Sequence, residues 1–385
     1  MIIGIDIRML ARGTRSGIEE YTINLLSNML KLDNGIQYKL FYNGYKKVGL
    51  DYDFLQLPNV ELKEFKIPNR LLDFSFQYFG FPKVDKLLGG VDVLFSPHIF
   101  SVAVSEKCKV VTTFHDLSFE NHKEFYSAAK NYWHFSMDPR KRARKSDKII
   151  AVSQSTKEDL TRIYKIEEKK INVIYSGVNL ASSIQHPASR ISKIKKKYSL
   201  PENFILYLGT IEPRKNIIGI IRAFEELRKR QDRTSPMVKS IKLVIAGSKG
   251  WLYKDVFECA RKSALIKDII FIGFVEDKDK EFIYKLAKIF VYPSFYEGFG
   301  FPPLEAMQNG TPVITSNFSS LPEAVGDAVI MVNPYNIDEL SLAMENLLRD
   351  EKLRKILIEK GYQQTKKFSW QQCAKETLKI LKAVK

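Results

Sequence analysis

Short, almost wholly apolar runs alternate with longer helical patterns along nearly the whole 385-residue chain. Runs such as Phe204–Leu208 contain no charged position, which is typical of strands buried on both faces of a parallel sheet. The pattern predicts strands at 2–7, 38–42, 91–95, 109–114, 148–152, 171–175, 204–208, 242–246, 269–272, 289–292, 312–315 and 329–332. Since a chain of this length suits about two domains, the sequence predicts an α/β protein with two doubly wound domains.

The domain junction is visible as a change in composition. Residues 181–200 are polar, contain a proline and are strongly basic, and a new buried strand follows them. We therefore predict a first domain over residues 1–180 and a second domain that begins at residue 203.

The net charge of +17 is unevenly distributed. Residues 1–180 carry +6, residues 181–202 carry +4, residues 203–350 are neutral and residues 351–385 carry +7. Such a balance could suit nucleic acid, an anionic membrane or a phosphorylated small molecule. Because the middle of the second domain is neutral and no nucleic-acid-binding motif occurs, we expect no nucleic-acid partner.

The segment 130–148 contains seven bases and two acids, interleaved with aromatic residues. One interpretation is a helix with a solvated basic face and an aromatic face in the core. The other is a surface that contacts an anionic membrane.

The three cysteines are far apart, no signal peptide precedes the first strand and no apolar run is long enough to span a bilayer. We therefore expect a cytoplasmic protein, peripheral at most on the inner face of the cell membrane.

The most informative motif is the stretch 294–307, which follows an apolar strand. Gly298 and Gly300 allow the backbone to approach a ligand closely. Pro302 suits the first position of a helix, whose N-terminal N–H groups and dipole would favour a phosphate or sugar oxygen. Glu297 and Glu305 flank this helix start and can each accept two hydrogen bonds from ligand hydroxyl groups.

Three other strand ends carry candidate ligand groups. Gly209 and the pair Arg214 and Lys215 follow the first strand of the second domain, where adjacent cations suit a diphosphate. The stretch from Asp6 to Ile18 follows the first strand of the chain and leads into a helix near Gly17. His115 lies at the end of a buried strand, and ligands of open α/β sheets gather at such ends.

Together these motifs resemble those of retaining glycosyltransferases of family 4. The resemblance rests on the E-x7-E pair of Glu297 and Glu305, on 209–216, on His115-Asp116-Leu117 and on 173–179, and it covers nearly the whole chain. It implies a GT-B fold, in which two Rossmann-like domains face each other across a cleft. It also implies a second domain over 203–368 and a final helical segment, 369–385, that crosses back to the first domain.

The resemblance also implies roles for individual residues. Glu305 would hold the ribose, Lys215 would bind the diphosphate, and the segment 273–275, with Val275, would lie against the base. Glu297 would contact donor sugar hydroxyls beside the backbone of Gly298, Phe299 and Gly300. Gly17 would let the first-domain loop close on the diphosphate, and His115 would reach the sugar near its 6-hydroxyl.

The chain departs from the family pattern at Thr210, where many members carry arginine directly after the glycine. Arg214 is the candidate for the missing cation. His115, Lys215, Arg214 and Glu297 would form the catalytic set, and Gly209 and Thr210 would also contact the donor. The leaving diphosphate would help to deprotonate the acceptor on the front face, and catalysis would come from positioning and charge stabilisation without a metal or cofactor.

The motif variants look most like those of bacterial mannosyltransferases of polysaccharide assembly. We therefore favour GDP-mannose as the donor and a glycan or a lipid-linked oligosaccharide as the acceptor, in cell-surface polysaccharide synthesis. The alternatives are a UDP-sugar-dependent glycosyltransferase of the same family and a nucleotide-sugar epimerase of the GT-B fold.

Overall fold

A computed structural model describes residues 1–12, 17–44, 49–179, 188–230 and 239–384. The chain forms two compact units. Unit 1 contains residues 1–121, 128–177 and 368–385, and unit 2 contains residues 122–127 and 178–367. The division does not follow chain order, because residues 122–127 of the predicted first domain belong to unit 2 and the C-terminal helix belongs to unit 1.

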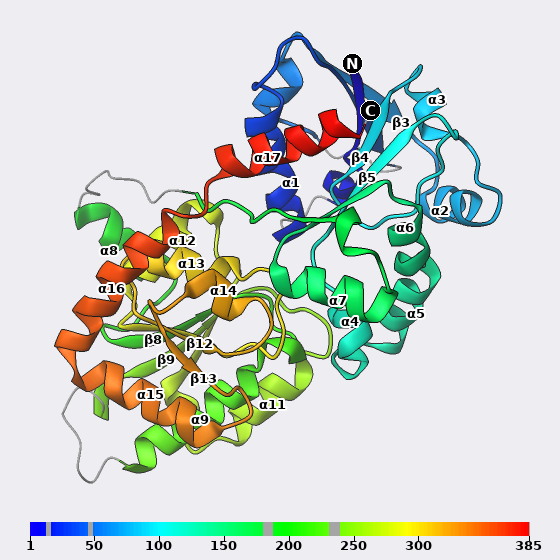
Figure 1. The fold of residues 1–385 in the computed structure, drawn as a ribbon. Coiled ribbons are helices and arrows are strands. Elements are labelled where there is room, and N and C mark those ends of the chain that lie inside the picture. Colours follow the sequence, from blue (N-terminus) through cyan, green and yellow to red (C-terminus); the bar gives the residue numbers. More distant parts are fainter. Residues whose placement is uncertain (13–16, 45–48, 180–187, 231–238, 385) are drawn as a thin grey trace. The chain divides into compact units, whose positions relative to one another are not determined.

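Unit 1 is built on a seven-stranded parallel sheet with the order β3-β2-β1-β4-β5-β6-β7 (Figure 1). Its strands are β1 (Ile2–Asp6), β2 (Gln37–Asn43), β3 (Val60–Phe65), β4 (Val93–Ser96), β5 (Lys109–Phe114), β6 (Lys148–Ala151) and β7 (Ile171–Val173). Its α-helices are α1 (Gly17–Met29), α2 (Asn69–Tyr78), α3 (Val84–Leu87), α4 (Ser118–Asn121), α5 (Ala128–Met137), α6 (Pro139–Lys145), α7 (Gln154–Tyr164) and α17 (Trp370–Ala383).

The helix α17 packs against α1 within unit 1. The rings of Tyr21 and Trp370 meet edge to face with centroids 5.9 Å apart. A Cβ atom on Gly177 would lie 2.2 Å from the backbone nitrogen of Trp370. The glycine of the 173–179 motif therefore allows the close passage of the chain at the start of α17.

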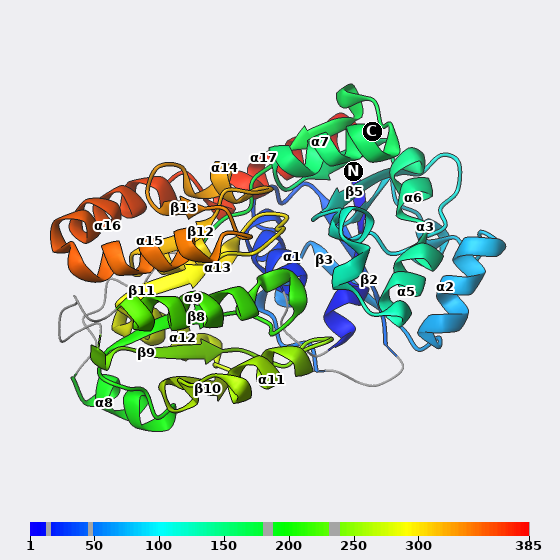
Figure 2. The same ribbon diagram turned by 90° about the horizontal axis from the view of Figure 1, so that it is seen from below.

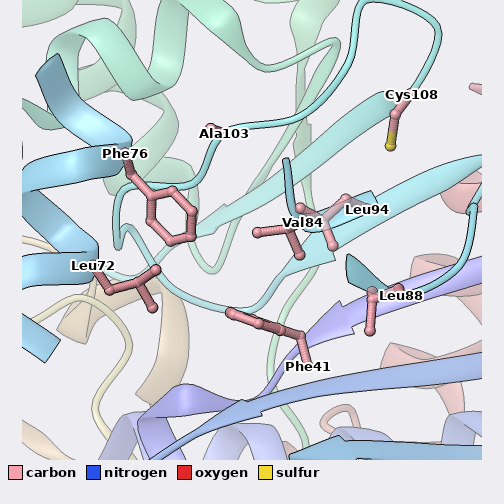
Figure 3. Close-up of a cluster of buried hydrophobic side chains, with 8 residues drawn as sticks. All are labelled: Phe41, Leu72, Phe76, Val84, Leu88, Leu94, Ala103 and Cys108. Atoms are coloured by element: carbon pink, nitrogen blue, oxygen red, sulfur yellow. The ribbon is translucent and has the colours of Figure 1, made fainter. Parts of the chain in front are cut away.

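One apolar cluster of unit 1 joins α2 and α3 to the sheet (Figure 3). Leu72 and Phe76 of α2 pack with Phe41 of β2 and Leu94 of β4, and all four are buried. This cluster fixes which face of α2 points inward.

Unit 2 is built on a six-stranded parallel sheet with the order β10-β9-β8-β11-β12-β13. Its strands are β8 (Phe204–Leu208), β9 (Lys242–Ala246), β10 (Ile269–Gly273), β11 (Ile289–Tyr292), β12 (Val313–Ser316) and β13 (Ile330–Val332). Its α-helices are α8 (Ala188–Lys197), α9 (Ile217–Lys229), α11 (Lys254–Lys262), α12 (Asp277–Leu286), α13 (Phe301–Gln308), α14 (Leu321–Val325), α15 (Ile337–Arg349) and α16 (Glu351–Thr365). The helices α9, α11 and α15 cover one face of the sheet, and α12, α13 and α16 cover the other (Figures 1 and 2).

The short segment 122–127 contacts the rest of unit 2 through aromatic side chains. The ring of Phe125 stacks on Phe295 with centroids 5.2 Å apart, and that of Tyr126 stacks on Trp251 at 5.5 Å. The Trp251 indole N–H donates a 2.6 Å hydrogen bond to the carbonyl oxygen of Phe125. The segment therefore packs directly beside the loop that follows β11.

Each of the twelve predicted strands is present, and the α/β prediction is confirmed. The strand that the sequence did not predict is β3, in which no side chain is fully buried: four are half-buried and two are exposed. It lies at the edge of the sheet. An edge strand need not be apolar on every position, so a search for wholly apolar runs misses it.

Candidate active site

The strand order of unit 2 reverses between β8 and β11. Ligands of doubly wound folds bind at the carboxyl ends of the strands at such a switch point. The loop after β8 contains Gly209 to Asn216, and the loop after β11 contains Pro293 to Gly300. The cation motif after β8 and the glutamate motif after β11 are far apart in the sequence, and they therefore meet at one edge of the sheet.

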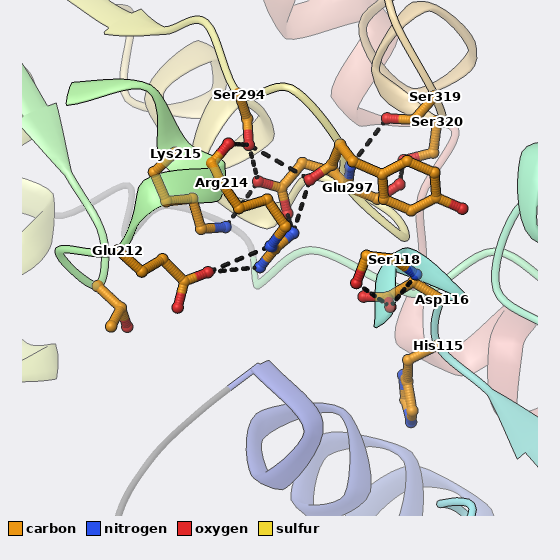
Figure 4. A network of polar contacts seen from close by, with 12 residues as sticks. His115, Asp116, Ser118, Glu212, Arg214, Lys215, Ser294, Glu297, Ser319 and Ser320 are labelled. Carbon is orange, nitrogen blue, oxygen red and sulfur yellow. Dashed lines mark hydrogen bonds and ion pairs between the residues drawn. The ribbon is translucent and has the colours of Figure 1, made fainter. Parts of the chain in front are cut away.

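Two cations and two carboxylates form a buried network there (Figure 4). The Lys215 ammonium lies 2.6 Å from Glu297 Oε1, and Arg214 Nη1 lies 3.0 Å from Glu297 Oε2. Arg214 Nη2 also lies 2.9 Å from Glu212 Oε1. Because two positive and two negative side chains pair within the network, its net charge is zero before any ligand binds.

Hydroxyl groups complete the surroundings of Lys215 and Glu297. Lys215 donates to the Tyr292 hydroxyl at 2.6 Å, and the Ser294 hydroxyl donates to Glu297 Oε1 at 2.6 Å. The Ser319 hydroxyl accepts the backbone N–H of Glu297, and the Ser320 hydroxyl donates to its carbonyl oxygen. The Glu297 carboxylate and backbone are therefore both held from several directions.

Glu297 keeps its charge although it is buried. Burial alone would raise the pKa of Glu297, but the charges of Arg214 and Lys215 hold it at about 2. Burial and the nearby Arg214 lower the pKa of Lys215, while Glu297 opposes that effect. Glu297 is therefore ionised at any ordinary pH.

Asn216 positions the cation pair. Its backbone is left-handed, with φ of 56°, and its side-chain amide donates to the carbonyl oxygens of Pro293 and Pro334 at 3.2 and 2.7 Å. It is also the residue directly before α9. Asn216 thus ties the two switch-point loops together, a role that the sequence motif did not reveal.

The helix α13 begins at Phe301, so Pro302 is its second residue rather than its first, and Glu305 is its fifth. Gly300 precedes the helix with φ of 106°, where a Cβ atom would lie 2.7 Å from Leu321. Glycine is therefore required at this turn. Gly298 and Phe299 form the rest of the turn between Glu297 and the helix start.

Glu305 is partly exposed on α13, and its Oε2 accepts a 2.8 Å hydrogen bond from the Tyr284 hydroxyl.

In the segment predicted to meet a base, Val275 is buried, whereas the Phe274 ring is 61% exposed. The Phe274 ring is therefore the side chain of this segment that is open to stack on a base, while the role of Val275 stays a prediction. Gly209 and Thr210 follow β8, and the carbonyl oxygen of Thr210 accepts from the Tyr207 hydroxyl at 2.9 Å.

The remaining predicted site residues lie in unit 1. Gly17 is exposed as the first residue of α1, and the residues 13–16 of its loop lie outside the described part of the chain. His115 follows β5, and its Nε2 lies 2.8 Å from the Pro97 carbonyl oxygen. Burial lowers the pKa of His115 to about 4, so its ring is neutral at pH 7 with its proton on Nε2. The next residue, Asp116, accepts hydrogen bonds from the backbone and hydroxyl of Ser118 (Figure 4).

Unit 1 has a switch point of its own, between β1 and β4. Arg8, just after β1, binds Asp6 through Nη2 at 2.7 Å and Asp73 through Nη1 at 3.2 Å. His98 follows β4, and its Nε2 lies 3.5 Å from Asp6 Oδ1. The Arg8 guanidinium also lies 5.3–5.7 Å from the ring centroids of Phe41, Phe76 and Phe100.

Comparison with known proteins identifies the family. Residues 15–182 match the family Glycosyltransferase Family 4, and residues 190–364 match Glycosyl transferases group 1. The O-antigen chain mannosyltransferase B of Escherichia coli is 32% identical over 279 residues, which are 71% of this chain and 70% of that protein. The chain is a glycosyltransferase of family 4.

A second relative of this glycosyltransferase is the serotype-specific mannosyltransferase WbdA of Escherichia coli, 36% identical over 264 residues. These residues are 68% of this chain but 32% of WbdA, so the match spans about a third of that longer protein. Sucrose-phosphate synthase from Thermosynechococcus elongatus superposes with a TM-score of 0.77 at 18% identity, over 100% of this chain and 98% of that one. A glycosyltransferase from Rickettsia africae gives a TM-score of 0.72 at 20% identity, over 100% and 98%. The predicted GT-B fold is thereby confirmed.

No helix among the described residues has the length and apolarity to cross a bilayer. Within the same ranges, no group of three or more His, Cys, Asp or Glu side chains is arranged to hold a metal ion.

Sequence reasoning found the ion pair partners Arg214, Lys215 and Glu297 but missed the groups that hold them. Glu212 lies inside the 209–216 motif but was given no role of its own, and Tyr292 is the last residue of the apolar strand β11. Ser319 and Ser320 follow β12, which carried no recognised motif. The unit 1 cluster was missed because Asp6, Arg8, Asp73 and His98 come from distant parts of the chain. The signal available in the sequence was that Asp6 and Arg8 lie at the end of the first strand.

Proposed function

We propose that the glycosyltransferase moves mannose from GDP-mannose to a glycan or lipid-linked oligosaccharide, with retention of anomeric configuration, in cell-surface polysaccharide synthesis. The observation that carries this proposal is the buried network of Arg214, Lys215 and Glu297 at the switch point of unit 2. The names of the two Escherichia coli relatives support mannose as the sugar and a polysaccharide as the product.

Lys215 is the best-placed group to bind the donor diphosphate. An ammonium has three N–H donors. Tyr292 and Glu297 account for two of them in the described part of the chain, so a third can bind a diphosphate oxygen. As negative charge grows on the departing diphosphate, Lys215 can shift toward it while Glu297 stays paired with Arg214, which stabilises the transition state.

Glu297 and Glu305 have different tasks in this proposal. Glu297 stays ionised and can accept hydrogen bonds from sugar hydroxyls near its pairing with the cations. Glu305, partly exposed on α13, can accept from the two ribose hydroxyls while Tyr284 orients it. The developing charge can be met by Lys215, Arg214 and the N-terminus of α13, and we expect the reaction to need no metal or cofactor.

The front-face mechanism requires no enzymic nucleophile. The bond between the anomeric carbon and the diphosphate oxygen breaks, and the acceptor oxygen attacks from the same side. The released diphosphate oxygen takes the acceptor proton. The enzyme's part is to hold the acceptor on the same face of the sugar as the departing diphosphate and to stabilise that leaving group.

Thermal-shift measurements with GDP-mannose, UDP-glucose and ADP-glucose test the donor. A ligand at 100 times its Kd stabilises a protein by about 2.7 kcal/mol, so GDP-mannose should raise the Tm by several degrees and the other two should not. A clear preference for a UDP sugar would favour the alternative enzyme of the same family. Product formed without any acceptor would favour a nucleotide-sugar epimerase.

Stereochemistry is tested on the product of transfer to a soluble mannoside. An axial anomeric bond like that of GDP-mannose, read from the one-bond C–H coupling, is expected for retention. An inverted bond would contradict the front-face mechanism while leaving the donor assignment intact.

We also propose that the acceptor is met at the cytoplasmic face of the cell membrane. The support is the basic aromatic segment 130–148, which spans α5, α6 and the start of β6 in unit 1.

A further inference from the structure

The helix α2 of unit 1 is apolar on two opposite sides. Leu72 and Phe76 point into the core, where they pack on Phe41 (Figure 3). On the other side Leu71, Phe74 and Tyr78 are 50–67% exposed. Surface helices of globular proteins normally carry a single apolar stripe, and a helix that is apolar all round is normally covered.

The apolar surface continues beyond the helix. Phe79 and Phe81, in the turn after α2, are 73% and 65% exposed. The ring of Phe74 contacts Tyr78 and Phe79, with centroids 4.6 and 5.8 Å apart. These rings form one continuous patch rather than isolated exposed side chains, which would need no explanation.

A second apolar ridge lies on α5. Tyr132 and Phe135 are 73% and 82% exposed. Trp133 on the same helix meets Phe100 edge to face, with ring centroids 6.0 Å apart. Because Phe100 and Phe76 both lie against the guanidinium of Arg8, α2 and α5 are supported by the same core. In both ribbon views α2, α5 and α6 lie on one flank of unit 1 and α17 on another (Figures 1 and 2).

The bases around these two ridges have few acids beside them. Between residues 66 and 86 the acids are Asp73, which binds Arg8, and Asp85, which accepts from Ser105. Between residues 128 and 145 the single acid is Asp138, which caps α6 by accepting from the backbone of Lys141. The exposed bases of the two segments are Lys66, Arg70, Lys86, Arg140, Lys141, Arg144 and Lys145.

The structure corrects one part of the expected basic surface. Arg142 is 7% exposed, and its Nη2 donates to the Ser96 hydroxyl at 2.8 Å, so it points into unit 1. It therefore cannot join the other bases of α6 in contacting a membrane.

We infer that unit 1 docks on an anionic bilayer through α2, the turn with Phe79 and Phe81, and the exposed face of α5. Aromatic side chains that insert at the lipid interface, with bases beside them, are the pattern that binds such membranes. A second copy of the chain is a poorer occupant, because a two-fold contact would place these bases against one another. The inference deepens the proposed function by naming the surface through which a lipid-linked acceptor is reached.

Vesicle co-flotation of the full chain tests the inference. The probes are vesicles of phosphatidylcholine alone and vesicles with about a third phosphatidylglycerol. We expect binding to the anionic vesicles, and we expect Phe74→Ser with Phe79→Ser to weaken it by about tenfold or more. The matched control is Leu342→Ser with Ile356→Ser, two helical positions of unit 2 that are 48% and 45% exposed. It should bind like the unaltered protein.

The contribution of the exposed bases of α6 to vesicle binding is tested separately. Neutralising Arg140, Lys141 and Arg144 to Gln should weaken binding about fivefold for each base, and added salt should erase the difference. Equal flotation of the Phe74/Phe79 variant and the control would overturn the inference. So would a monomer–dimer shift on sedimentation that the same variant abolishes, because the patch would then be a protein interface.

Donor binding and transfer to a soluble mannoside are read in the same preparations. The Phe74/Phe79 variant should retain both, because neither residue is among those assigned to the donor site in either unit. Loss of vesicle binding with intact transfer supports the surface and the enzyme together. Intact vesicle binding without any transfer would reject the proposed function but would still support the membrane-docking surface.

Discussion

The two switch points of the molecule use similar side chains for different ends. In unit 1, Arg8 is bound by Asp6 and Asp73 and enclosed by three aromatic rings. In unit 2, Lys215 and Arg214 share Glu297, and the neighbours of Lys215 include the rotatable hydroxyl of Tyr292. The first arrangement fixes a guanidinium in place, and the second leaves an ammonium able to exchange a partner.

The pKa shifts at the two switch points differ in the same way. The pKa of Asp6 is held far below its usual range by Arg8 and His98, against the effect of complete burial. Burial and the charge of Arg214 lower the pKa of Lys215, so its ammonium is less well stabilised from within the protein and a ligand anion would stabilise it further. The same topological position can therefore serve as a structural anchor or as a binding site, according to whether the cation is fully satisfied from within.

The largest expected effect is a loss of stability when Arg8 is replaced. Arg8→Leu leaves the buried Asp6 carboxylate without its main partner, and removing one member of a buried ion pair typically costs about 3–5 kcal/mol of stability. Urea unfolding of the full chain measures it. A variant as stable as the original protein but unable to transfer sugar would reverse the roles that we assign to the two switch points.

The next largest effect is on turnover. Lys215→Ala removes a group that stabilises the leaving diphosphate and should reduce kcat by about 10²–10³-fold. The fold should survive because Arg214 still pairs with Glu297. Steady-state transfer rates beside a melting curve separate the two outcomes, and near-original turnover by the folded variant would count against the site.

A smaller effect is expected at the base-binding segment. Phe274→Ala removes an exposed ring, and loss of stacking on one base typically costs about 1–3 kcal/mol. Calorimetric titration with GDP should show weaker binding, while Val275→Ala, at a buried neighbour, should change stability more than affinity. If the two variants behave in the opposite way, Val275 rather than Phe274 contacts the base.

The smallest effect concerns pH. The pKa of His115 is about 4 in the folded chain and near 6.5 in the unfolded chain, so the unfolded chain binds the proton first as the pH falls. Stability should therefore decline between pH 6.5 and 4, and less steeply in His115→Gln. Unfolding free energies at pH 7.5 and 5 measure the difference, and parallel declines in both proteins would show that His115 is not buried in its neutral form.

The sequence predicts the scaffold well because parallel strands buried on both faces are apolar at almost every position. The edge strand β3 does not meet that criterion, since none of its six side chains is fully buried. Helix phase is harder to predict: the basic run of α6 reads as one charged surface, yet Arg142 faces inward.

The donor motifs are predictable because Lys215 and Glu297 each lie in a local pattern at a strand end. The groups that hold them are not, since Tyr292, Ser319 and Asn216 act through contacts between loops far apart in sequence. The patch on α2 is also invisible in the sequence, because its apolar residues look like a core helix until the structure shows that one side is uncovered.

The most direct test of the central claim is calorimetric titration of GDP-mannose into the full chain and into Lys215→Ala, with Leu342→Ser as a surface control. We predict binding to the original protein and to the control, and at least tenfold weaker binding to Lys215→Ala. Equal affinity of all three proteins would contradict the assignment of the unit 2 switch point as the donor site.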